Sequence, residues 1–172
     1  MSLLSEKVNA PSLHSLLFHE LQDLYDAEFQ ILDALPKLIE ASSLPELKKA
    51  FRDHMKETEH QVSRLEQCFA LINEKPKRSG CDGMKGVLKE GDHVLKGKMD
   101  PETKDDGIIM SAQRVEHYEM AGYGAAREHA KVLGYKEMAE LLHETLQEEG
   151  NADHTLSAIA KSKHKKMATA GR

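Results

Sequence analysis

The sequence contains no tryptophan and few other aromatic residues, with four Phe and four Tyr among 172 residues. Aromatic platforms on which nucleic-acid bases could stack are therefore not expected. The charge balance agrees, because 24 Lys and Arg residues stand against 29 Asp and Glu residues and the formal net charge is −5. A nucleic-acid-binding surface requires an excess of basic residues. These shortages exclude nucleic acid from the expected partners.

Cysteines and long apolar runs are scarce as well. Cys68 and Cys81 are too few and too far apart for a disulfide framework or a thiolate metal cluster, and they suit a reducing compartment. No apolar stretch approaches the roughly 18 residues that a membrane-spanning helix requires. The first residues also lack the basic segment and apolar run of a secretory signal. We therefore expect a cytoplasmic protein with no membrane partner.

Apolar residues recur with helical spacing along most of the chain, and no run shows the alternation that is typical of strands. Ser12 suits an N-cap, Pro45 and Pro101 suit the first positions of helices, and Gly134 suits a helix C-terminus. Four long helices are predicted over residues 12–42, 45–73, 101–133 and 135–161, with a shorter helix over residues 84–97. The predicted fold class is all-α.

The connections between the predicted helices indicate how the helices are arranged. Short turns near residues 43 and 134 join the first two and the last two long helices into antiparallel hairpins. The connection over residues 74–100 is long enough to run the length of a bundle, and one long crossover in the middle is typical of ferritin-like four-helix bundles. We expect a single domain over residues 1–163 and a flexible basic tail over residues 164–172.

Each predicted long helix carries an acidic residue on or beside its apolar face. Four acids fall on the apolar faces and two on their flanks, namely Glu28, Glu116, Glu119 and Glu149, and Glu57 and Asp153. Residues at equal distances from a hairpin turn lie at the same height. By this rule Glu28 pairs with Glu57 across one turn, and Glu119 pairs with Glu149 across the other. Two independent hairpins therefore each place two carboxylates at one level.

A buried carboxylate without a partner costs several kcal/mol, so a group of them needs compensating positive charge. Lysine and arginine are scarce on the same helix faces and cannot supply it. Oxygen-rich coordination with one imidazole suits iron or manganese, whereas zinc prefers thiolate and imidazole ligands. Glutamates that project inward from paired helices are typical of di-iron and di-manganese proteins. For any one of these acids alone, a side chain that reaches solvent is the competing interpretation, and for Asp153 a structural salt bridge.

The second predicted long helix offers two histidines as nitrogen ligands. The stretch "ETEH", residues 57–60, looks like the Glu-x-x-His pair of di-iron proteins, but His60 points away from the apolar face. His54 lies on that face and is the predicted imidazole near the site. Two roles are open for His54, that of a metal ligand and that of a core or supporting histidine.

Two glycines interrupt the third predicted long helix in the stretch "AGYGAA". Gly122 and Gly124 each cost up to about 1 kcal/mol relative to alanine in the middle of a helix. The cost indicates that another helix approaches closely at this point, within the bundle or across a dimer interface. The alternative is a pair of glycines that the helix tolerates without a packing reason.

The sequence matches a known family along most of its length, in order from about Leu16 to Ile159. The matching stretches are "ELQDLYDAEFQ", "AFRDHMKETEHQVSRLE", "AQRVEHYEMAGYG" and "LGYKEMAELLHETLQEE". They closely resemble the YciE/YciF-like family of ferritin-like bacterial proteins. The resemblance implies a ferritin-like bundle, an association with stress responses and a homodimer.

Rubrerythrins, which belong to the wider ferritin-like group, carry metal-binding glutamates at matching places. The resemblance implies the same role for Glu28, Glu57, Glu116, Glu119 and Glu149. Asp153 stands where rubrerythrins place a histidine, and the sequence lacks the Cys-x-x-Cys pairs of a rubredoxin-like domain. Both differences argue against a complete peroxide-reducing electron chain.

Two functions follow from these patterns. The first is a protein that binds two iron ions, with manganese as the alternative, and reduces a small oxidant such as peroxide or dioxygen. Tyr25 and Tyr123 lie near the expected site and are either partners of the oxidant or ordinary core residues. The second function is a metal-binding or structural stress protein without turnover. Whether the protein is an enzyme is left open by the sequence.

Overall fold

The computed structural model describes residues 10–170, and in that range it contains five helices and no strand. The helices are α1 (Leu13–Ala41), α2 (Pro45–Leu71), α3 (Asp82–Lys96), α4 (Pro101–Val132) and α5 (Lys136–Ala170). The predicted all-α class and the short extra helix in the crossover are confirmed. The predicted starts and ends agree to within a few residues, except that α5 continues well past the predicted end at residue 161.

The helices begin and end where the local sequence dictates. The Ser12 hydroxyl accepts a hydrogen bond from the Ser15 N–H at 3.1 Å and caps α1. Pro45 and Pro101 occupy the first positions of α2 and α4, where the N–H that proline lacks would have no hydrogen-bond partner within the helix. Gly134 has a φ of +81°, a conformation that glycine adopts without strain, and it separates α4 from α5.

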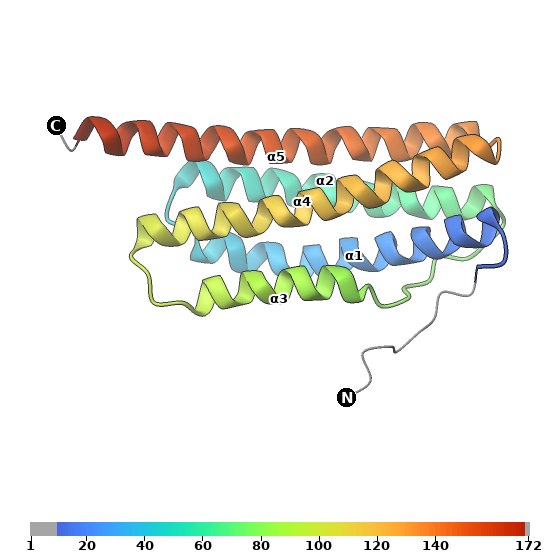
Figure 1. The fold of residues 1–172 in the computed structure, drawn as a ribbon, viewed down its shortest axis with the longest axis horizontal. Coiled ribbons are helices and arrows are strands. Elements are labelled where there is room, and N and C mark those ends of the chain that lie inside the picture. Colours follow the sequence, from blue (N-terminus) through green and yellow to red (C-terminus); the bar gives the residue numbers. More distant parts are fainter. Residues whose placement is uncertain (1–9, 171–172) are drawn as a thin grey trace.

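The four long helices form an antiparallel bundle in which each helix contacts two of the others. The contacting pairs are α1–α2, α2–α5, α5–α4 and α4–α1. The short helix α3 lies outside this square against α1 and α4, and the crossover that contains it runs along the bundle from the end of α2 to the start of α4 (Figure 1). The predicted topology of two hairpins joined by one long connection is confirmed.

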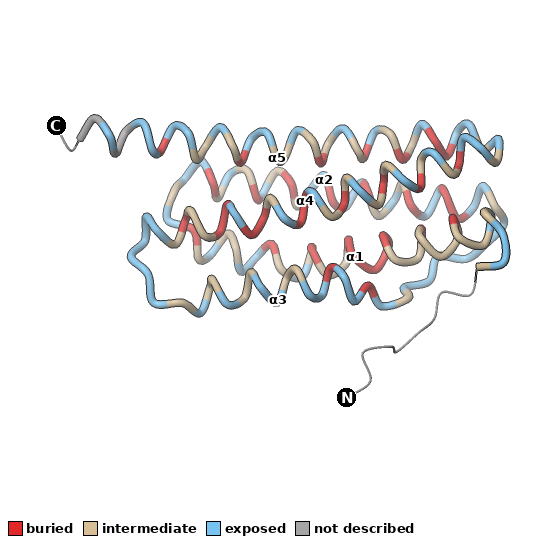
Figure 2. Tube along the Cα trace, viewed as in Figure 1, coloured by how far each residue is buried: buried red, intermediate tan, exposed pale blue. Residues whose placement is uncertain are grey.

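The apolar interior is divided into two clusters along the bundle axis. One cluster, near the α4–α5 turn, contains Leu24 and Tyr123, and the other, near the α1–α2 turn, contains Ile31 and Phe51. Buried residues recur along each of the four long helices (Figure 2). The buried residues between the two clusters are polar, and they are Glu28, His54, Thr58, Gln61, Glu116, Glu119, Thr145 and Glu149. A polar layer therefore crosses the middle of the bundle.

The C-terminal end of α5 projects past the other helices (Figure 1). Lys163 is buried by the start of α4, where its ammonium group contacts Asp106, and His164 lies 3.0 Å from the same carboxylate. Residues 164–170 are helical, and residues 171 and 172 lie outside the described range. The flexibility expected for residues 164–172, and with it the domain boundary, stays a prediction. Among the described helices, none is long and apolar enough to cross a membrane.

The two mid-helix glycines have different surroundings. A Cβ on Gly122 would lie 2.8 Å from Leu24 Cδ2 of α1, so this glycine permits the close approach of α4 and α1. A Cβ on Gly124 would meet nothing within 4 Å. The close approach of another helix is therefore confirmed for Gly122 and is not the reason for Gly124.

This difference predicts opposite outcomes for two alanine variants. We expect Gly124→Ala to raise the free energy of unfolding by about 0.5–1 kcal/mol, because alanine favours the helix and nothing opposes the methyl group. In Gly122→Ala the same gain is offset by about 1–3 kcal/mol of overpacking against Leu24. Urea unfolding of the two variants measures the difference, and equal stabilisation would show that α1 and α4 are not in close contact at Gly122.

Candidate metal centre

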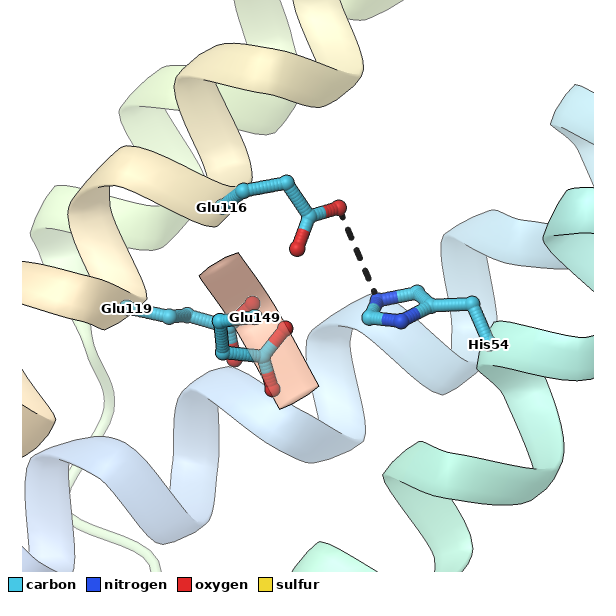
Figure 3. A group of neighbouring side chains, drawn as sticks. All are labelled: His54, Glu116, Glu119 and Glu149. Carbon is cyan, nitrogen blue, oxygen red and sulfur yellow. Dashed lines mark ion pairs between the residues drawn. The ribbon is translucent and has the colours of Figure 1, made fainter. Parts of the chain in front are cut away.

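Four side chains from three helices converge in the polar layer. They are His54 of α2, Glu116 and Glu119 of α4, and Glu149 of α5, and each residue is at most 6 % exposed. One nitrogen or oxygen atom from each of them lies within 4.8 Å of the others (Figure 3). We call these four residues the central group. All four are among the predicted metal ligands. The tertiary fold thus brings together side chains that the helical periodicity predicts on the apolar faces of different helices.

Most polar atoms of the central group have no hydrogen-bond partner within the described part of the chain. This holds for both oxygens of Glu119 and of Glu149, for both ring nitrogens of His54 and for Oε2 of Glu116. One ion-pair contact lies within the group, from His54 Nε2 to Glu116 Oε1 at 3.6 Å (Figure 3). Each buried polar atom without a partner costs about 1–3 kcal/mol, and a charged group costs more. The group therefore fits a ligand that accepts several carboxylates at once.

Basic side chains do not supply the missing positive charge. Among the residues whose burial the structure describes, Lys163 is the one fully buried Lys or Arg, and its partner is Asp106. Arg64 is half-buried and donates two hydrogen bonds to the Glu148 carboxylate, at 2.6 and 2.7 Å. Protons or metal ions must therefore balance the charge of the central group.

Glu28 of α1 adjoins the central group and has one of its oxygens engaged. The Tyr123 hydroxyl donates a hydrogen bond to Glu28 Oε1, while Oε2 has no partner among the described residues. Glu28 is 1 % exposed and Tyr123 is fully buried. Thus α1, the one long helix without a member in the central group, also contributes a carboxylate to the polar layer.

Burial and mutual repulsion raise the pKa values of all four glutamates. Burial, together with the charge of Glu149, raises the pKa of Glu28 to about 8. The pKa of Glu116 is likewise about 8, chiefly because of burial and then because of Glu28 and Asp153. Burial and the neighbouring carboxylates raise the pKa values of Glu119 and Glu149 well above their usual range.

The same environment raises the pKa of His54. Burial alone lowers it, but the nearby carboxylates of Glu57, Glu149 and Glu28 outweigh this effect. In the metal-free protein, the raised pKa values favour protonated carboxyls in the central group at neutral pH.

The two flank residues lie outside the central group. The Glu57 side chain is 48 % exposed, and its Oε2 lies 3.8 Å from His54 Nδ1, on the opposite edge of the ring from Glu116. Asp153 accepts a hydrogen bond from Gln113 Nε2 at 2.9 Å and lies 3.4 Å from His117 Nε2. Glu57 therefore lies beside His54, at the edge of the site. Ligation by Glu57 or Asp153 stays a prediction.

Two further candidates point away from the layer. His60 is exposed, as the helical wheel predicts, whereas His54 is buried, also as predicted. Tyr25 donates its hydroxyl to Glu66 Oε1 at 2.9 Å and packs its ring against Phe29 and Phe69, outside the central group. Tyr25 is therefore a core residue, while Tyr123 reaches the site through Glu28.

Sequence reasoning missed the polar contacts that border the central group. Gln61 is fully buried and donates to Glu148 Oε2 at 3.0 Å, and Arg64 holds the same carboxylate. The available signal was the position of Gln61 on the apolar face of α2, seven residues after His54. The ion pair of Arg64 with Glu148 therefore lies at the residue that precedes Glu149 in α5.

Comparison with known proteins gives consistent matches over nearly the whole chain. The model of the family described as "Domain of unknown function (DUF892)" matches residues 12–169. Protein YciF of Escherichia coli is 39 % identical over 154 residues, which cover 89 % of this chain and 93 % of that protein.

The solved structures agree with the sequence matches. The crystal structure of YciF, described as an Escherichia coli stress protein, superposes with a TM-score of 0.88 at 38 % identity over 91 % of this chain and 99 % of that one. YcfI of Rhodopseudomonas palustris superposes with a TM-score of 0.85 at 35 % identity, covering 89 % of this chain and 98 % of that one. The predicted ferritin-like bundle with a short extra helix is confirmed.

Proposed function

The chain belongs to the DUF892, or YciF-like, family, and from its buried carboxylates we propose that it binds a dinuclear iron centre in the polar layer of the bundle. The observation that carries the proposal is the set of carboxylate oxygens in the central group that have no partner among the described residues. The proposed ligands are the central group (His54, Glu116, Glu119 and Glu149) together with Glu28.

The charges favour two metal ions over one. Glu28, Glu116, Glu119 and Glu149 carry four negative charges when ionised, and two divalent cations balance them while His54 stays neutral. Carboxylate-rich coordination suits iron or manganese, and the absence of a cysteine from the central group disfavours zinc. Manganese is the alternative metal.

The proposed activity is the reduction of a small oxidant, peroxide or dioxygen, for which bound iron supplies the electrons. The protein's own residues prepare the site for this role. The two apolar clusters keep bulk water from both ends of the polar layer. Tyr123 holds a proton at its hydroxyl against Glu28 Oε1, and burial beside Glu28 keeps the pKa of that hydroxyl well above its usual range.

The relative YciF is described as a stress protein, and we place this chain in an oxidant or stress response as a cytoplasmic homodimer. The second candidate function is a metal-binding or structural stress protein without turnover. It is favoured by the placement of Asp153, which contacts Gln113 and His117 where rubrerythrins have a metal-binding histidine.

Metal analysis of the purified protein tests the proposal. Protein expressed in iron-supplemented medium and purified without chelator is expected to carry about two iron or manganese ions per chain by plasma mass spectrometry. The double variant Glu28→Ala/Glu119→Ala should carry none, and Glu59→Ala, which removes an exposed acid of α2, should match the wild type. A metal-free wild type would refute the proposal.

Addition of peroxide to the loaded protein then separates the two candidate functions. A change in the visible spectrum that depends on peroxide and recurs after re-reduction indicates turnover. A loaded protein whose spectrum peroxide leaves unchanged indicates metal binding alone.

A further inference from the structure

A pocket of about 190 Å³ opens between α2 and α5 and ends at the central group. Its floor is formed by the buried residues His54 and Glu116. Ala50 of α2 and Ala152 of α5 form part of its walls, and their small side chains leave the passage open. The volume is room for several water molecules, each of which occupies about 30 Å³ in the liquid. A hydrated ion therefore fits this pocket, and a large organic cofactor does not.

Acidic and polar side chains surround the outer end of the pocket. Glu57 and Asn151 are exposed there, and Asp53 is half-buried. Glu57 and Asp53 thus bring two carboxylates to the opening. Lys49 forms an ion pair with Asp53 and offsets part of the charge. Negative charge at the opening of a cleft raises the local concentration of cations.

The other cavities do not offer a comparable path. A second cavity that reaches His54 and Glu116 measures only about 20 Å³, and most of its lining is apolar, for example Leu35 and Val115. A larger cavity, about 470 Å³, is bordered by Leu44, Ile159 and Lys163 and is lined by no member of the central group. Among the cavities described here, the pocket between α2 and α5 is the one that joins exposed acids to the central group.

We propose that divalent cations reach the buried centre through the pocket between α2 and α5, passing from Glu57 at its opening to Glu116 and His54 at its floor. The inference rests on the proposed function, because it presupposes that the central group binds metal. His54 lies between the two carboxylates, 3.8 Å from Glu57 and 3.6 Å from Glu116, so a cation can exchange one oxygen ligand for the next over short steps.

Stopped-flow loading of the metal-free full-length protein with Co²⁺, followed by its visible absorption, tests the path. Ala152→Leu, which narrows the pocket, should slow loading at least about tenfold and leave the final amount of bound cobalt unchanged. Ala70→Leu, an exposed position on α2 outside the pocket, should load at the wild-type rate.

A second variant tests whether negative charge at the opening attracts cations, and it changes no proposed ligand. It also keeps the test decisive if Ala152→Leu does not fold. Asn151→Lys adds a cation at the opening and should slow loading at least about tenfold at low salt, and less at high salt. Ala70→Lys adds the same charge at an exposed position of α2, roughly 20 Å along the helix from Glu57, and should slow loading much less.

The outcomes separate this inference from the proposed function. Cobalt binding by the wild type with unchanged rates in Ala152→Leu and Asn151→Lys would overturn the path and leave the metal centre standing. Equal slowing in the variants and their controls would overturn it as well. A wild type that binds no cobalt, iron or manganese would overturn the centre and the path together.

Discussion

The double variant Glu119→Gln/Glu149→Gln is expected to unfold at higher urea concentration than the metal-free wild type and to lose metal binding at the same time. Both carboxyls are buried, and their pKa values lie well above the usual 4.5 because of burial and mutual repulsion. A carboxyl that is protonated only in the folded state costs about 1.4 kcal/mol for each pH unit above its unfolded pKa. Glutamine keeps the shape and has no charge to lose, so we expect a gain of several kcal/mol at pH 8.

The same substitution removes two of the proposed ligands. We expect the affinity for iron or manganese to fall at least about 1,000-fold, since even supporting residues around a metal contribute 10–100-fold. Plasma mass spectrometry of the protein as purified measures metal binding. Urea unfolding after removal of the metal by a chelator measures the stability of the metal-free form. Glu140→Gln, an exposed position on α5, is the matched control and should change neither. Retention of metal by the double variant, or a metal-free form less stable than the wild type, would contradict the assignment.

Raising the pH is expected to destabilise the metal-free protein and not the metal-loaded protein. The pKa values of Glu28 and Glu116 rise on folding from the usual 4.5 to about 8. A carboxyl with a raised pKa favours the folded state below its unfolded value, and this stability is lost as the pH rises through the folded value. The raised pKa of His54 acts in the same direction. Between pH 5 and 8 each such group removes up to about 1.4 kcal/mol per pH unit.

Bound metal replaces these protons, so the loaded protein should show a flat or rising stability over the same range, and its metal affinity should increase with pH. Urea unfolding of chelated and loaded protein at intervals between pH 5 and 8 tests this. The free energy of unfolding of metal-free Glu119→Gln/Glu149→Gln should decrease less steeply with pH, because this variant has fewer buried carboxyls that titrate. A metal-free wild type whose stability is constant or increases over this range would refute the buried carboxylate layer.

Helical periodicity determined most of the architecture, because the burial of a helix face is written into the spacing of apolar residues. It predicted the four long helices, the crossover with α3, and the burial of Glu28, His54 and Glu119. The hairpin between α4 and α5 also follows from sequence, since equal distances from Gly134 bring Glu119 and Glu149 to one level. These features depend on local geometry that repeats along a helix.

Residues on the flank of a helix face were decided only by the tertiary structure. Glu57 follows His54 by three residues, which turns it about 60° away from the direction of His54, and the α2–α5 packing leaves that direction partly open to solvent. Asp153 follows Glu149 by four residues, about 40° further around α5, and there it contacts Gln113 and His117 of α4.

The contact of Tyr123 with Glu28 and the pocket beside Ala152 join side chains of different helices. The rotation of each helix against its neighbours sets such contacts, and a single sequence does not contain that rotation. The sequence by itself thus determined which carboxylates enter the bundle, and the packing of the helices decided which of them meet and from which side the site is reached.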